Sequence, residues 1–550
     1  MRIEFDTEFA STDHIYTRAN AGEVFPQVIT PLVWTLLGPG IERGMMRCMA
    51  GDFAAIDPLP DGYLACGRMA GRLHLNLTVF RTVSARMPGG DPRDLDIQYF
   101  GDAVANGLPA YQRTRADRRR LAKTTLATLG TVAGFERRLH RESAEALRLQ
   151  EQTSALLARC PDERTLLDHL LVLRAPHSRG MGSQVTARAL ASSAVSLAMK
   201  AYAKRDVAPP DALRAISDIP DLLSAKPSRA LQALAAGLPD QAVLTKALSD
   251  GMTWQELQVS DVEHAEDLRA RLVTFLRDYG HRGVNEFDPA SRVWGNSPDL
   301  VLGLLRPLLN QRPADRLAMA PSTSQLGPVG RRLLANARTS IARGERTKDN
   351  IIRITHQMRL TLDALAERLN DRLGLVRQDL LAMSLEELRA VVEGSSVPAA
   401  AIERRQRELD AARAVEPAEW SQGSLVLRER HTSTGVQQLA GLPGAGGIAR
   451  GPVRILRDVD DDFDDGDVLV VSMTDTAWTP LFLAAAGVIT DSGGPLSHAT
   501  IVAREIGIPS VVNTKTATTE LSDGDVVEVD GDQGVVRVLE RALPRAGKDG

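Results

Sequence analysis

Cysteine is scarce in this chain of 550 residues. The three cysteines, Cys48, Cys66 and Cys160, are odd in number and show neither a Cys-x-x-Cys nor a metal-ligand spacing. This excludes a disulfide framework and fits a reducing compartment. The N-terminus also lacks a basic region followed by an apolar stretch, so we expect a cytoplasmic protein without a signal peptide.

Long apolar runs, aromatic residues and an excess of one charge are lacking as well. No apolar run reaches the roughly 18 residues of a membrane helix, which argues against a membrane partner. The formal net charge is only -4, and aromatic residues make up 4% of the chain. A basic footprint and a stacking surface for bases are therefore missing, and we expect no nucleic-acid partner.

The chain is too long for one hydrophobic core, so two or more domains are expected. Residues 110–415 are rich in Ala, Leu, Arg and Glu, with apolar residues three and four apart, which predicts helices. From Ile448 to Leu539, short β-branched runs separated by turns predict strands, with a helix at Ala499–Ile506 between the third and fourth.

The expected fold class is therefore α/β and multidomain. We expect a large, mostly α-helical domain over residues 1–420, which we interpret as substrate-binding, and a small β/α domain over residues 441–540. The Ser- and Gly-containing stretch at 421–440 is predicted to be an interdomain linker, long enough to let a small domain change partners.

One histidine stands out in the predicted β/α domain. Gly493 and Gly494 follow a predicted strand, and Ser497-His498 opens the helix after them. A helix N-terminus offers free N–H groups and a positive dipole end, which suit a phosphoryl group on the neighbouring imidazole. Neutral imidazole is nucleophilic near pH 7, and Ser497 and Arg504 could bind phosphate oxygens. The alternative is a helix-capping histidine with a satisfied side chain.

The run from Thr490 to Pro509, TDSGGPLSHATIVAREIGIP, closely resembles the phosphohistidine signature of the phosphoenolpyruvate-utilising enzymes, which include pyruvate phosphate dikinase and phosphoenolpyruvate synthase. The resemblance extends to residues 446–451, 475–481 and 529–531. It implies that residues 441–540 form the swivelling domain of that family. His498 would then be the phosphohistidine, which receives a phosphoryl group at one site and delivers it at another.

Two further segments, residues 20–32 and 279–288, resemble the substrate-binding region of rifampicin phosphotransferase and its relatives, which include a phenylphosphate synthase subunit. In the second segment, His281, Arg282 and Glu286 supply a base, a cation and an orienting acid. His281 could take the proton of the acceptor hydroxyl while Arg282 steadies the phosphoryl group. The alternative is a buried turn in which His281 and Glu286 satisfy each other and Arg282 pairs with a surface acid.

The same resemblance implies substrate-binding roles for Asn20 and Glu23 and phosphate-binding roles for Arg346 and Lys348. Each has an alternative reading. The Thr30-Pro31 pair that follows the first segment is equally good as a helix start. The charges between 343 and 349 alternate in sign, which also fits a solvated helix face.

The relatives begin with an ATP-binding domain, whereas nineteen residues precede Asn20 here, and the chain contains no Gly-x-x-x-x-Gly-Lys loop. A phosphoenolpyruvate-binding barrel is not found after the β/α domain either. The resemblance therefore implies a carrier and an acceptor site. ATP and Mg²⁺ would be bound by a separate ATP-binding subunit, since no metal-ligand cluster is found in this sequence.

Three functions remain open. The first is a phosphotransferase subunit that carries a phosphoryl group on His498 from an ATP-binding partner to a small-molecule acceptor. The second is a donor-independent enzyme, of the dehydratase or condensing type, that uses His498 as an acid or base. The third is a non-catalytic regulatory relative. The intact Gly-Gly-x-x-Ser-His-Ala motif favours the first over the third, and neither the acceptor nor the oligomeric state follows from the sequence.

Overall fold

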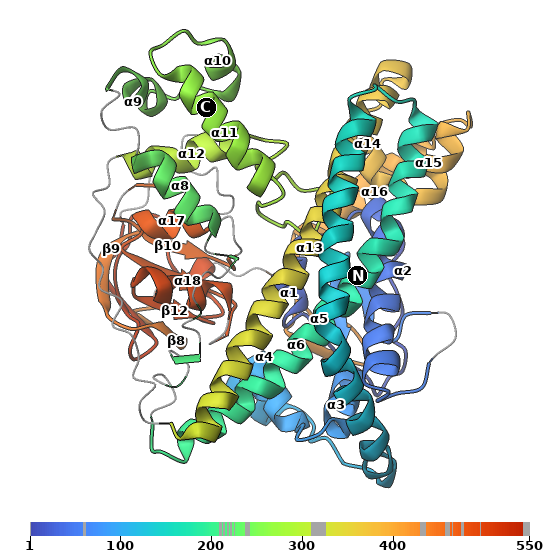
Figure 1. The fold of residues 1–550 in the computed structure, drawn as a ribbon, viewed down its shortest axis with the longest axis vertical. Coiled ribbons are helices and arrows are strands. Elements are labelled where there is room, and N and C mark those ends of the chain that lie inside the picture. Colours follow the sequence, from blue (N-terminus) through green and yellow to red (C-terminus); the bar gives the residue numbers. More distant parts are fainter. Residues whose placement is uncertain are drawn as a thin grey trace. The chain divides into compact units, whose positions relative to one another are not determined.

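The computed structural model divides the chain into two compact units, whose elements are labelled in Figure 1. Unit 1 comprises Met1–Leu197, Asn285–Ser291 and Leu333–Arg430, and unit 2 comprises Ala198–Val284, Arg292–Arg332 and His431–Gly550. The structure describes residues 2–58, 62–207, 212, 215–216, 219, 223–224, 226–236, 242–309, 326–429, 436–456, 463–464, 466–474, 478–494 and 497–542.

Three long helices dominate unit 1 (Figure 1): α5 (Arg115–Leu157) and most of α6 (Glu163–Ala203) and α13 (Pro328–Leu373). Buried apolar residues recur at helical spacing along them, as at Phe135 and Leu139 in α5 and at Leu362 and Leu365 in α13. The apolar spacing between 110 and 415 therefore does correspond to helices.

The N-terminal part of unit 1 forms a small sheet of order β2-β3-β1-β5, all antiparallel. Its strands are β1 (Ile15–Thr17), β2 (Cys66–Met69), β3 (Arg72–Asn76) and β5 (Trp420–Gln422). The remaining elements of unit 1 are α1 (Ala21–Val24), α2 (Pro31–Met46), the π-helix η1 (Arg47–Asp52), α3 (Leu77–Arg86), α4 (Pro92–Gly107), α14 (Arg377–Ala382), α15 (Leu385–Val392), α16 (Ala399–Arg413), β4 (Val415–Pro417) and β6 (Leu427–Glu429).

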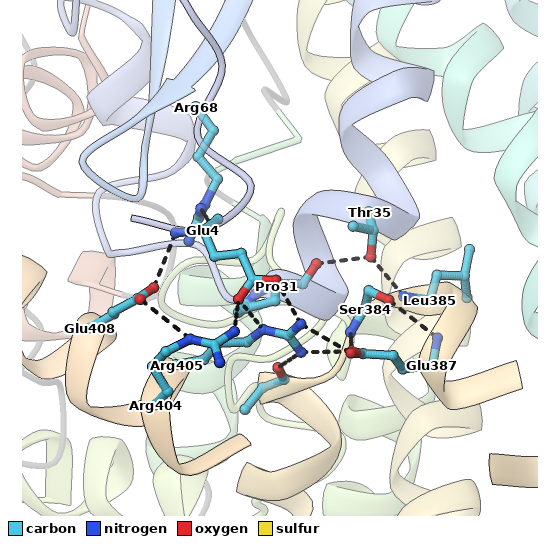
Figure 2. Close-up of polar contacts among 11 residues, drawn as sticks. Glu4, Pro31, Thr35, Arg68, Ser384, Leu385, Glu387, Arg404, Arg405 and Glu408 are labelled. Carbon is cyan, nitrogen blue, oxygen red and sulfur yellow. Dashed lines mark hydrogen bonds and ion pairs between the residues drawn. The ribbon is translucent and has the colours of Figure 1, made fainter. Parts of the chain in front are cut away.

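An ion-pair network ties the N-terminal segment of unit 1 to α15 and α16. The guanidinium of Arg405, whose side chain is 4% exposed, bridges Glu4 at 2.8 Å and Glu387 at 2.6 Å. Figure 2 shows Arg404 and Arg405 converging on Glu4, while Arg68 donates to the Glu4 carbonyl at 2.8 Å. The network therefore joins segments about 400 residues apart in the sequence.

Among the described residues, the first part of unit 2 contains the helices α8 (Lys226–Ala236), α9 (Ala242–Ser249), α10 (Trp254–Val259), α11 (Ala265–Tyr279) and α12 (Asp299–Leu309). Their buried leucines, such as Leu231 and Leu268, belong to the same hydrophobic cluster as Phe482 and Val502 from the C-terminal part of the unit. Unit 2 thus has a continuous apolar core.

The C-terminal part of unit 2, which we call the C-terminal domain (described residues 436–542), is built on an eight-stranded sheet of order β7-β14-β13-β9-β10-β11-β12-β8. The pairs β9–β10, β10–β11 and β11–β12 are parallel, and the other pairs are antiparallel. The strands are β7 (Gln438–Ala440), β8 (Leu442–Ala445), β9 (Ile448–Ile455), β10 (Val468–Val471), β11 (Gly487–Thr490), β12 (Ser510–Val512), β13 (Val526–Asp530) and β14 (Val535–Glu540), with helices α17 (Thr479–Ala484), α18 (His498–Ile506) and α19 (Ala517–Glu520).

The expected fold class, a large mostly helical region followed by a small β/α domain, is confirmed. The strands predicted between Ile448 and Leu539 correspond to β9 to β13, and the predicted helix corresponds to α18. The two compact units are discontinuous in sequence, unlike the expected domains 1–420 and 441–540, whose boundaries stay a prediction. Within the predicted linker 421–440, β5, β6 and β7 pair with other strands, and residues 430–435 lie outside the described part of the chain.

Candidate functional site

The loop after β11 makes a tight turn. Thr490 Oγ1 donates to the Ser492 carbonyl at 2.7 Å, and the Ser497 N–H donates to the Gly494 carbonyl at 2.9 Å. Gly493 has φ +134°, and a Cβ there would lie 3.0 Å from Ser497 Oγ. This position therefore requires glycine. Pro495 and Leu496, between these residues and α18, lie outside the described residues.

His498 is the first residue of α18, and Ser497 is its N-cap. Among the described residues, the Ser497 side chain makes no capping hydrogen bond; its Oγ lies 3.2 Å from Thr500 Oγ1, which donates to the Gly494 carbonyl at 2.9 Å. The two hydroxyls thus brace the loop, and the Ser497 side chain does not cap the first amide groups of α18, which suits an anion-binding helix N-terminus. The imidazole of His498 lies outside the described side chains.

Arg504 lies in the last turn of the same helix. Its Nε donates to the Gly444 carbonyl at 2.7 Å, so this part of the guanidinium ties α18 to β8. The phosphate-binding roles of Gly493, Gly494, Ser497 and Arg504 stay predictions.

Asp491 is a further residue of this loop, and the sequence reasoning did not single it out. Its carboxylate accepts a hydrogen bond from the Thr518 N–H at 3.1 Å and another from the Thr518 hydroxyl. These bonds join the loop after β11 to the N-terminal end of α19. The position of Asp491 directly after a β-branched strand is the signal that could have identified it.

In the segment of residues 279–288, His281 and Arg282 belong to unit 2 and are 3% and 2% exposed. Here the backbone crosses itself closely, because the Trp294 N–H donates to the Arg282 carbonyl at 2.9 Å. A Cβ on Gly283 would lie 2.6 Å from Val293 Cα, which explains the glycine after the His-Arg pair. The geometry is that of a rigid buried turn, and the catalytic roles of His281 and Arg282 stay predictions.

Glu286 and Lys348, predicted separately, form an ion pair in unit 1. Glu286 Oε1 lies 2.8 Å from Lys348 Nζ, and the two side chains are 1% and 13% exposed. The same Nζ lies 5.8 Å from the centroid of the Phe287 ring, whose centroid is 6.4 Å from that of Phe25. Unit 1 therefore brings a carboxylate, a cation and the segment after Asn20 together.

The buried Arg359 side chain holds this segment from α13. It donates to the carbonyls of Asp288 and Ser291 at 2.8 and 2.7 Å. Burial lowers the pKa of Arg359 to about 10, so the guanidinium stays charged at neutral pH. These bonds attach the backbone of Asp288 and Ser291, and with it the segment that contains Glu286, to α13.

The other predicted residues of unit 1 are less closely grouped. Asn20 precedes α1 with a left-handed φ of 61°, and Glu23 lies in α1 with its side chain outside the described set. Arg346 donates to Glu136 at 2.7 Å, next to a 2.8 Å bond from Arg343. Burial alone would raise the pKa of Glu136, but the two arginines lower it overall. Arg346 is therefore already neutralised by a partner, and its phosphate-binding role stays a prediction.

Metal-binding and membrane-spanning features are not seen in the described part of the chain. Over those residues, His, Cys, Asp and Glu side chains nowhere gather in threes in a way that could hold a metal ion. None of the helices described is both long and apolar enough to cross a membrane.

Two family models match the chain. The PEP-utilising enzyme mobile domain matches residues 463–534, which contain the loop after β11 and α18. The rifampicin phosphotransferase fourth domain matches residues 183–394, which contain His281, Glu286 and Lys348. The resemblance to the phosphoenolpyruvate-utilising enzymes is thus confirmed at residues 463–534, and that to rifampicin phosphotransferase at residues 183–394; neither match contains residues 20–32. Residues 475–477 of that resemblance lie outside the described residues.

Individual relatives agree with these matches. An uncharacterised protein of Mycobacterium tuberculosis is 27% identical over 571 residues, which cover 98% of this chain and 63% of the relative. Rifampicin phosphotransferase of Bacillus cereus is 27% identical over 302 residues, or 50% of this chain and 35% of that enzyme. The uncharacterised phosphotransferase YvkC of Bacillus subtilis is 47% identical over 122 residues, or 22% of this chain and 14% of the relative. The chain thus spans less than two thirds of the length of these relatives.

Proposed function

We propose that this chain is the carrier and acceptor component of a phosphotransferase, in which His498 carries a phosphoryl group from an ATP-binding partner to a small-molecule acceptor. One observation carries this proposal. His498 opens α18 directly after a braced glycine loop, inside the segment matched by the mobile domain of the PEP-utilising enzymes.

The first step uses the imidazole as a nucleophile. A neutral ring nitrogen of His498 attacks a phosphorus atom of the nucleotide, the new N–P bond forms, and the bond to the bridging oxygen breaks as the nucleotide leaves. The amide N–H groups at the start of α18 stabilise the charge on the transferred group. The product is a phosphohistidine.

The second step transfers this group to a hydroxyl or carboxyl oxygen of the acceptor. The oxygen attacks phosphorus, the N–P bond breaks, and a base takes the proton of a hydroxyl acceptor. We assign this proton to His281 and the charge of the incoming phosphoryl group to Arg282. Glu286 and Lys348 would position the acceptor, since they form a nearly dry ion pair within the matched fourth domain.

The phosphoryl donor in this proposal is ATP with Mg²⁺, bound by a separate subunit. The chain has no Gly-x-x-x-x-Gly-Lys loop, and the described residues hold no carboxylate cluster for a metal. Neither family match corresponds to an ATP-binding domain. The C-terminal domain would swivel between the subunit that loads His498 and the acceptor, and would then part from the helices of unit 2 with which it shares an apolar core.

Labelling tests the proposal. The chain is incubated with ³²P-labelled ATP, alone and together with a candidate ATP-binding partner protein. We expect acid-labile label on the unaltered chain and on His140→Ala, a matched control at an exposed histidine of α5. His498→Ala should carry none. Label that persists in His498→Ala, or an unaltered chain that no condition labels, contradicts the proposed function.

A further inference from the structure

Three loops leave the carboxyl ends of neighbouring parallel strands in the C-terminal domain. The Ser492 N–H donates to the Ser472 carbonyl at 2.9 Å, which joins the loop after β11 to the loop after β10. On the other side, the Lys515 N–H donates to the Asp491 carbonyl at 3.0 Å, which joins it to the loop after β12. Ligands of open α/β sheets bind at this edge. The loop that leads to His498 is therefore flanked by two others.

The backbone of the loop after β12 is unusual. Asn513 and Lys515 have φ values of 62° and 73°, in the left-handed region that favours glycine. A lysine in this conformation is strained, and such residues cluster at functional sites. The Lys515 side chain is exposed. A side chain retained at a position suited to glycine indicates that its ammonium group has a role.

Lys515 is also distinguished from the other cations of the C-terminal domain. It is the only lysine between residues 436 and 542. Its backbone is bonded to the loop that leads to His498, through the Asp491 carbonyl.

The loop after β10 provides an independent observation. Thr474 is 8% exposed, and its Oγ1 is buried with no hydrogen-bond partner among the described residues. A buried hydroxyl without a partner is unfavourable, so this geometry points to a ligand that accepts its hydrogen bond.

We propose that Lys515 and Thr474 hold the phosphoryl group carried on His498. This inference rests on the proposed function and adds two residues to its site. The ammonium group neutralises the charge of the phosphoryl oxygens, and the threonine hydroxyl donates a hydrogen bond to one of them. Together with the N-terminus of α18, they enclose the group from both neighbouring loops. Both residues bind the group and take no part in proton transfer.

The test loads His498 without any donor protein. Phosphoramidate transfers its phosphoryl group to histidine nitrogen and releases ammonia, and the ³¹P signal lost in His498→Ala identifies the phosphohistidine. The ³¹P shift is then titrated against pH in the full chain. A nearby cation favours the dianion and lowers the phosphoryl pKa. Lys515→Gly should raise the titration midpoint by about one pH unit, and Thr474→Val should raise it by less.

Lys515→Gly separates binding from folding, because glycine suits the left-handed φ of 73°. We expect this variant to fold at least as stably as the unaltered chain and still to shift the midpoint. Arg450→Gln is the matched control. It removes an exposed cation that precedes the parallel part of β9, at the amino ends of the parallel strands, and it should leave the midpoint unchanged.

The outcomes distinguish the two proposals. If His498 is labelled from ATP but neither variant moves the midpoint, the inference fails and the proposed function stands. If phosphoramidate gives no signal that depends on His498, the inference fails with the carrier role. An equal shift in Arg450→Gln would show a general charge effect and would also overturn the inference.

Discussion

Lys348 and Glu286 are almost closed to water, with 13% and 1% of their side chains exposed. Two charges in such a place lose most of their hydration, and their attraction offsets that loss only while both are present. An acceptor with a hydroxyl or a phosphate could compete for either partner. The pair is therefore suited to position a polar small molecule. Removing one partner should also lower the free energy of unfolding.

We predict that Lys348→Met lowers the free energy of unfolding by about 3–5 kcal/mol, because the buried Glu286 carboxylate loses its ion pair with Lys348. The double variant Glu286→Met, Lys348→Met should recover most of that loss. Urea unfolding measures both. Discharge of labelled His498 by a small-molecule extract should stay lost in the double variant. Recovery of stability and discharge together would show that the pair is structural only.

At the scale of elements, the sequence predicted what is encoded locally. β10 is buried along its whole length, so it appears as the uninterrupted run Val468–Val471. α18 is framed by a glycine loop before it and by Gly507, at φ 77°, after it. The pairing of β5 with β1 could not be predicted, because it joins residues about 400 positions apart that carry no shared pattern.

In the candidate site, too, locally encoded features could be predicted and contacts between distant segments could not. His498 was predicted because its signature is contiguous in sequence, and a buried turn at His281 was one of the two alternatives for that segment. The contact between Glu286 and Lys348 joins two distant segments and depends on the packing of α13. Lys515 and Thr474 were missed, because a left-handed φ and an unpartnered hydroxyl exist only in the folded backbone.

The buried turn that contains His281 and Gly283 gives a prediction at the scale of elements. Gly283→Ala places a methyl group 2.6 Å from Val293 Cα, which is backbone and cannot rotate away. We expect the variant to lose about 1–3 kcal/mol of stability, as overpacked sites do. Gly303→Ala, in α12 with open space around the added Cβ, should instead gain up to about 1 kcal/mol. Thermal unfolding compares the stabilities of the two variants. Equal effects would mean that the backbone of the turn shifts to accommodate the added methyl group.

At the scale of the whole chain, the network around Arg405 joins residues near both ends of unit 1 (Figure 2). The hydrogen bond from Arg405 holds the pKa of Glu4 at about 2, well below its ordinary value of 4.5. A depressed carboxyl pKa contributes stability that is present above the ordinary value and is lost as pH falls through the folded-state value. The network thus couples the stability of unit 1 to pH between about 4.5 and 2.

We therefore predict that Arg405→Gln lowers stability by about 3 kcal/mol at pH 7, because a nearly buried charge is removed from two carboxylates. As the pH falls from 4.5 towards 2, Glu4 takes up a proton in the unaltered chain and loses its ion pair. The difference between the two proteins should shrink over this range. Urea midpoints at successive pH values measure it. Arg404→Gln, at a side chain that is 52% exposed, should cost at most about 1 kcal/mol. A gap between Arg405→Gln and the unaltered chain that stayed constant down to pH 2.5 would mean that Arg405 acts through packing, with no contribution from the charge of Glu4.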